Sequence, residues 1–260
     1  MQTQKTDIHS EFLSIKDMLA SYLYRLTANK TDAEDLLQDT FIRVNDKIET
    51  FLGKSSFKTW VFTIATNLAH DNKRVRNRWE LDVQDKCKHA AAESVPYQEK
   101  MKVAFQSQIE KQFDITEHIN YCFTCVGKNL SMEKQIAVIL KEVYDFKRTE
   151  IAEILKTTEG VVKHLLFEGR KELQDKFQNR CALINKTGVC YQCAQLNNYF
   201  QNDKSAETKI AELPFSEKNT PEENLEHRFK LIQRINPLRS NGAHLEDTIL
   251  QILRETIHDH

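Results

Sequence analysis

Glycine and proline are both scarce in this chain, with 6 glycines and 4 prolines among 260 residues. β-Sandwiches and β-barrels need turn residues at short intervals, so this scarcity argues against a turn-rich β architecture and favours helices. No apolar run approaches the roughly 20 residues of a membrane-spanning helix. The first residues, MQTQKTDIHSEF, also lack an apolar stretch typical of a signal peptide. We therefore expect an all-α protein in the cytoplasm, with no membrane partner.

An excess of charge of one sign is also missing. The chain has 37 basic and 38 acidic residues, which gives a formal net charge of −1. This total does not indicate a nucleic-acid-binding protein, so any basic surface has to be local. Six cysteines are present. In the reducing cytoplasm they are expected to be metal ligands or core residues rather than disulfides.

Helical periodicity divides the chain into four predicted parts. They are a three-helix bundle at 1–80, a polar linker at 81–117, a second helical domain at 118–196 and a helical extension at 197–260. A capping box formed by Thr31 and Glu34 is expected to open the second helix of the bundle. Within the linker, a weak helical pattern covers residues 98–112.

The third helix of the bundle changes character along its length. The stretch SSFKTWVFTIATNLAHDNKRVRNRW (55–79) begins with aromatic and apolar residues and ends in a run of positive charge. Aromatic rings beside basic side chains are what single-stranded nucleic acid requires, because bases stack on the rings while cations hold the phosphates. The alternative is that the rings fill the bundle core and the basic end is solvated.

The second domain has the pattern of a helix-turn-helix. Ser131 is the expected N-cap of its first helix, a short helix follows at 151–155, and the turn KTTEG (156–160) leads into a third helix at 161–173. Such a third helix enters the major groove and contacts base edges with residues near its N-terminus, here Lys163 and His164. The alternative is a three-helix unit that binds no DNA.

Two segments resemble a known family. DAEDLLQDTFIRV (32–44) and FLGKSSFKTWVFTIATNLAHDNKR (51–74) resemble region two of bacterial RNA polymerase sigma factors, most closely the extracytoplasmic-function (ECF) group. EIAEILKTTEGVVKHLLFEGRKEL (150–173) looks like their region four. The resemblance implies a non-enzymatic transcription initiation factor that binds core RNA polymerase and promoter DNA. It also leaves room for an anti-sigma partner.

The resemblance assigns three sets of residues and no catalytic ones. The core-polymerase set is Asp35, Leu36, Gln38, Asp39, Phe41 and Ile42. The set that captures a flipped base of the −10 promoter element is Lys54, Ser55, Ser56, Phe57, Trp60, Asn67, Lys73 and Arg74. The set for the −35 element is Gly160, Val161, Lys163, His164, Arg170 and Lys171. Leu165 stands where the family commonly has arginine, and Glu168 replaces a basic residue, so we expect weaker duplex binding by this helix.

The cysteines bracket the helix-turn-helix. Cys122 and Cys125 precede it, and Cys190 and Cys193 follow it. Two such Cys-x-x-Cys pairs can supply four thiolates to a tetrahedral structural or redox-sensing zinc, with Cys181 or His118 as substitute ligands. The alternatives are reduced thiols packed as small apolar groups and a thiol switch. No other cofactor is expected.

Two rival functions remain at this level. A stand-alone helix-turn-helix regulator with a zinc or thiol sensor would leave the region-two resemblance unexplained. A thiol oxidoreductase is disfavoured, because no βαβ pattern surrounds either cysteine pair. The role of the extension at 197–260 is open between folding back on the second domain and binding a partner.

Overall fold

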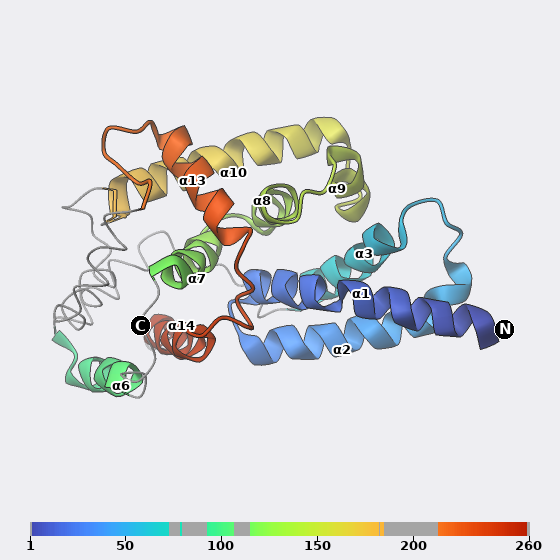
Figure 1. The fold of residues 1–260 in the computed structure, drawn as a ribbon, viewed down its shortest axis with the longest axis horizontal. Coiled ribbons are helices and arrows are strands. Elements are labelled where there is room, and N and C mark those ends of the chain that lie inside the picture. The colour runs from blue at the N-terminus through green and yellow to red at the C-terminus, as the bar shows by residue number, and fades with distance from the viewer. Residues whose placement is uncertain are drawn as a thin grey trace. The chain divides into compact units, whose positions relative to one another are not determined.

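The computed structural model describes residues 2–72, 79, 93–106, 115–181, 183–184 and 213–258, and every regular element in them is a helix (Figure 1). The predicted all-α class is thus confirmed. The helices form two compact units, one of Met1–Arg78 with Ser131–Gly169, the other of Trp79–Leu130 with Arg170–His260. The sequence-based division into four parts concerns consecutive segments, whereas each compact unit combines two separate segments. The four-part division stays a prediction. No helix in the described ranges is long and apolar enough to cross a membrane.

The first unit begins with three mutually packed helices, α1 (Gln2–Thr27), α2 (Lys30–Lys47) and α3 (Phe57–Asp71). Apolar residues three and four positions apart give each helix one buried stripe. Leu19 and Tyr22 of α1 and Phe62 of α3 are fully buried at its centre. The Tyr22 hydroxyl pairs with Thr66 Oγ1 at 2.8 Å, and burial raises the pKa of Tyr22 above its usual range. A 3₁₀ turn, η1 (Ile48–Thr50), follows α2.

The start of α2 differs from the prediction. Its N-cap is Asn29, whose Oδ1 accepts a hydrogen bond from the backbone N–H of Asp32 at 3.2 Å. The expected capping box at Thr31 and Glu34 is wrong, because both residues already lie inside the helix. Ala28 has a positive φ of 53°, and this conformation lets the chain reverse between α1 and α2.

The same unit contains the helix-turn-helix. It consists of α8 (Met132–Val138), a π-helical turn η2 (Ile139–Val143), α9 (Arg148–Ile154) and the first half of α10 (Glu159–Arg180). Ser131 caps α8 as predicted, accepting from the N–H of Lys134 at 3.4 Å. Gly169 allows α10 to approach α8 closely, since a Cβ there would lie 2.8 Å from Val138 Cγ2.

The second unit contains α6 (Val95–Gln106), α7 (Ile115–Gly127), the last turns of α10, α13 (Pro221–Ile232) and α14 (Ala243–His258). α13 packs on α7, and α14 packs on both α6 and α7. The weak pattern at 98–112 corresponds to α6, which begins three residues earlier and is described to residue 106. The extension at 197–260, expected to be helical, contains α13 and α14.

Candidate nucleic-acid interface

One face of α2 is open to solvent. Asp35, Gln38, Asp39 and Ile42 are exposed on it, and Ile42 is 57% exposed although it is a large apolar residue. Phe41 is half-buried, with its ring centroid 5.0 Å from that of Phe12. Leu36 is only 3% exposed, so it lies beneath this face as a core residue and is not part of it.

Three rings gather where the loop after α2 enters α3. Their centroids lie 5.0 Å apart for Phe51 and Trp60, 5.8 Å for Phe51 and Phe57, and 6.0 Å for Phe57 and Trp60. All three side chains are half-buried, so each keeps part of its surface in solvent. We call this group the aromatic triad. Its geometry suits an unstacked base, because every base can stack on a ring.

The loop beside the aromatic triad is polar and basic, with one exception. Lys54 is exposed, Ser55 is half-buried, and Leu52 is 74% exposed. Gly53 has a φ of 67°, which a residue with a side chain adopts only under strain. Sequence reasoning missed Phe51 and Leu52 as site residues. The signal was present, since both directly precede Gly53 in the loop before the predicted site helix.

Ser56 and Asn67 are held by the helix itself. Ser56 caps α3, since its Oγ accepts from the N–H of Thr59 at 3.1 Å. The amide nitrogen of Asn67 donates to the carbonyl of Thr63 at 2.7 Å, which leaves the side-chain oxygen to accept from a ligand. Lys73 and Arg74 lie outside the described residues.

The N-terminal end of α3 also contacts the helix-turn-helix. The hydroxyl of Thr59 donates to Glu150 Oε1 at 3.1 Å, and Lys58 Nζ lies 4.2 Å from the centroid of the Phe146 ring. Phe146 in turn packs against Phe62 in a tilted arrangement, with centroids 4.9 Å apart. The compact unit therefore brings the helix of the aromatic triad directly against α9.

The N-terminal turns of α10 are accessible. Gly160, Val161, Lys163 and His164 are exposed, and so is Lys171 further along. Val162 is fully buried and anchors the helix. The predicted groove-facing residues are thus free of cover from within their own unit.

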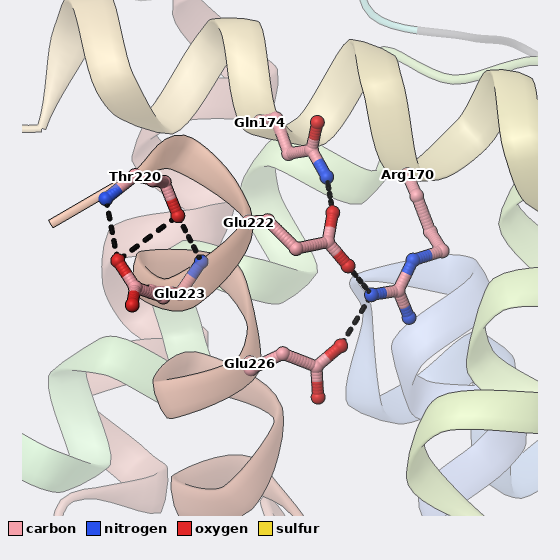
Figure 2. A network of polar contacts seen from close by, with 6 residues as sticks. All are labelled: Arg170, Gln174, Thr220, Glu222, Glu223 and Glu226. Atoms are coloured by element: carbon pink, nitrogen blue, oxygen red, sulfur yellow. Dashed lines mark hydrogen bonds and ion pairs between the residues drawn. The ribbon is translucent and has the colours of Figure 1, made fainter.

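Arg170 is in a different position. Its guanidinium donates to the carboxylates of Glu222 and Glu226 on α13, and Gln174 donates to Glu222 as well (Figure 2). The guanidinium carbon also lies 5.4 Å from the centroid of the Phe229 ring. Only 20% of the Arg170 side chain is exposed. The sequence predicted a DNA contact here but gave no sign of the acidic partners.

Two of the cysteines predicted as zinc ligands lie on α7. Cys122 is half-buried and Cys125 is buried, and His118 lies one turn earlier on the same helix. Burial, with a smaller effect of Arg228, lowers the pKa of His118 to about 4, so its imidazole is neutral at pH 7. Cys190 and Cys193 lie outside the described residues.

Cys181 has a partner of its own. Arg228 Nη2 donates to its Sγ at 3.3 Å, and the Arg228 guanidinium stacks 3.8 Å from the centroid of the Phe177 ring. Among the residues whose positions are described, no three His, Cys, Asp or Glu side chains are grouped to hold a metal ion. The zinc site stays a prediction.

Comparison with known proteins gives a family for the first part of the chain. Residues 12–79 match the model of sigma-70 region 2. The "ECF RNA polymerase sigma factor SigG" of Mycobacterium tuberculosis is 30% identical over 169 residues, which are 60% of this chain and 45% of that protein. The chain thus spans less than half the length of this relative.

Further relatives match over more of their length. SigX and SigW of Bacillus subtilis, both ECF RNA polymerase sigma factors, are 27% and 26% identical, with matches covering 76% and 85% of those proteins and 60% and 63% of this chain. A solved structure, the sigma factor RpoE in complex with the anti-sigma factor NepR from Bartonella quintana, aligns with a TM-score of 0.45 and 20% identity over 65% of this chain and 95% of that chain. Residues 12–79 are thus similar to sigma-70 region 2, and about 60% of the chain is similar to ECF RNA polymerase sigma factors.

Proposed function

We propose that this protein is a sigma factor, which binds core RNA polymerase and directs promoter recognition and strand opening. The observation that carries the proposal is the position of two surfaces. The exposed face of α2 and the aromatic triad both fall within residues 12–79, the segment that matches sigma-70 region 2. The names of the relatives support the same role. The protein would have no catalytic residues, act in the cytoplasm, and be open to control by an anti-sigma factor.

In this proposal each surface has one task. The acids and Gln38 on α2 contact the coiled coil of the largest polymerase subunit, with Ile42 supplying an apolar contact. The aromatic triad and Lys54 receive a base flipped from the −10 element, and Asn67 offers its side-chain oxygen as an acceptor. Stacking on a protein ring contributes about 1–3 kcal/mol per base, which offsets a large part of the cost of unstacking. Strand opening is therefore driven by binding the opened strand.

Promoter recognition also requires movement. The −10 and −35 elements lie about 25 base pairs apart, which is about 85 Å of duplex at 3.4 Å per base pair. α3 cannot bind one element and α10 the other while α9 remains against α3. The contact between Thr59 and Glu150 therefore has to break when the protein engages a promoter.

We also propose a structural or redox-sensing zinc held by Cys122, Cys125, Cys190 and Cys193. The first pair fits this role in part, because residues three apart on α7 share one face of the helix. His118 is a suitable substitute, since neutral imidazole is the form that binds metal. Such a zinc would stabilise the fold by crosslinking two distant segments, and oxidation of its thiolates would release it.

The test is an association and open-complex assay with core RNA polymerase on promoter fragments from the same genome. Trp60→Ala and Asn67→Ala should impair strand opening, detected by permanganate reactivity of unpaired thymines, while polymerase association survives. Equal loss of both activities would assign these residues a structural role. Absence of association, with the polymerase active on a control sigma factor, would instead favour a stand-alone regulator that binds duplex DNA.

A further inference from the structure

The extension at the C-terminal end of the chain engages the helix that is expected to bind DNA. Three residues of α10, each one turn after the last, contact α13. Arg170 donates to Glu222 and Glu226, Gln174 donates to Glu222, and Gln178 Oε1 accepts from the Asn224 amide at 3.2 Å. All of these residues belong to the same compact unit. They form a continuous polar seam between the two helices. Figure 1 shows α13 beside α10, and Figure 2 shows the contacts of Arg170 and Gln174.

Several contacts fix the first turn of α13, which positions the acidic residues of this seam. Pro221 lies in the first turn of α13, and a capping box joins Thr220 and Glu223, with the Thr220 N–H donating to Glu223 Oε2 at 2.7 Å. These bonds lower the pKa of Glu223 and fix the start of the helix. Glu222 and Glu226 are four residues apart, so they face the same way and meet one guanidinium. Leu225 and Phe229, both 1% exposed, lie beside the two acids and anchor α13 in the core.

A carboxylate and a DNA phosphate make the same demand on arginine, since both bind its guanidinium through charged oxygens. While Glu222 and Glu226 hold Arg170, that side chain cannot also hold a phosphate. We propose that α13 is an internal competitor for DNA, which occupies Arg170, a cation of α10 that would otherwise contact the promoter backbone. This inference rests on the proposed function, because it needs α10 to bind duplex DNA.

The experiment uses the full chain and a fluorescent promoter duplex, with affinity measured by anisotropy over a range of salt concentrations. Glu222→Gln with Glu226→Gln removes both acids that contact Arg170. Glu217→Gln with Glu223→Gln removes the same charge from the same region without touching Arg170, and glutamine still serves in the capping box. The first pair should bind duplex about five- to tenfold more tightly than this control. The slope of log K against log salt should steepen by about 0.9, the effect of one added phosphate contact.

A background lacking Arg170 gives the decisive comparison. In Arg170→Gln the two acidic pairs should have equal effects, because the competed side chain is gone. The proposal is overturned if the Glu222 and Glu226 change gains nothing over the control, or if its extra gain persists in Arg170→Gln. It is likewise overturned if no variant binds duplex at all. Polymerase association, measured in parallel, separates these failures from failure of the proposed function, because the docking face lies on α2.

Discussion

Replacing Thr59 by valine weakens the contact between α3 and α9 with little change in shape. Valine keeps the branched side chain but removes the hydroxyl, which donates to Glu150 Oε1 at 3.1 Å and also pairs with Ser56 Oγ at 2.8 Å. Ser56 is exposed and can exchange this contact for water. Thr59 is fully buried, whereas Glu150 is half-buried and can take a water molecule in exchange. A hydrogen bond to a charged acceptor contributes about 1.5–3 kcal/mol, and the exchange with water places the expected loss near 1–2 kcal/mol. This corresponds to a factor of about 5–30 in the equilibrium between closed and separated forms.

Two measurements follow from this number. Urea unfolding should show a free energy of unfolding about 1–2 kcal/mol lower than in the wild-type protein. Open-complex formation with core polymerase, at a protein concentration below saturation, should nevertheless rise by up to the same factor of about 5–30. The reason is that apparent affinity scales with the fraction of molecules in the competent form.

Thr63→Val is the matched control for this variant. It is the same substitution one turn further along α3, where the hydroxyl donates only within the helix, to the Thr59 carbonyl at 2.9 Å. Glu150→Gln weakens the same hydrogen bond from the α9 side. It should also lower the stability and raise open-complex formation, but by smaller amounts. Loss of stability in Thr59→Val without a gain in open complexes would refute the requirement for separation, and so would an equal gain in Thr63→Val.

Three further predictions concern single groups. Ser56→Ala should lower the free energy of unfolding by about 1 kcal/mol through loss of the N-cap of α3, with Ser56→Asp restoring it in urea titrations. Because burial raises the pKa of Tyr22, its neutral form is favoured in the fold, and stability should fall as the pH rises above about 10, by up to about 1.4 kcal/mol per pH unit. Tyr22→Phe should remove this part of the pH slope in unfolding titrations, whereas Thr66→Val should keep it. If zinc is present, native mass spectrometry under reducing conditions should find one ion per chain and none in Cys122→Ser, and metal-free wild-type protein would end the zinc hypothesis.

Most helices could be predicted from the sequence because their apolar residues repeat with the helical period. The exact residues at which the helices begin were harder to predict. Asn29 and Thr31 are both good N-cap residues, and only the position of the turn at Ala28 selects Asn29. The helical periodicity of α6 is weak in the sequence, because few large apolar residues mark its buried side. Its buried residues include Tyr97 and Met101. Its apolar partner, α14, comes more than a hundred residues later in the chain.

Some features of the candidate site could likewise be predicted from the local sequence, and others could not. The exposed face of α2 follows from helical spacing, which puts Asp35, Gln38 and Asp39 away from the core. Contacts that join distant segments leave no local trace, so neither the pairing of Thr59 with Glu150 nor that of Arg170 with α13 could be predicted. Leu36 was assigned to the docking face by resemblance, which matches positions and carries no information on burial.

The contact of α13 with Arg170 gains importance from the other substitutions in α10. Leu165 and Glu168 already remove basic residues that the family commonly has, so few cations remain at the positions expected to contact DNA. Each phosphate contact changes the salt slope by about 0.9, and one contact is a large fraction of a small total. Release of Arg170 would therefore alter duplex binding proportionally more here than in a relative with a fully basic helix. Control of Arg170 release by α13 would leave the polymerase-docking face on α2 unchanged. The protein would therefore be able to associate with polymerase before Arg170 contacts duplex DNA.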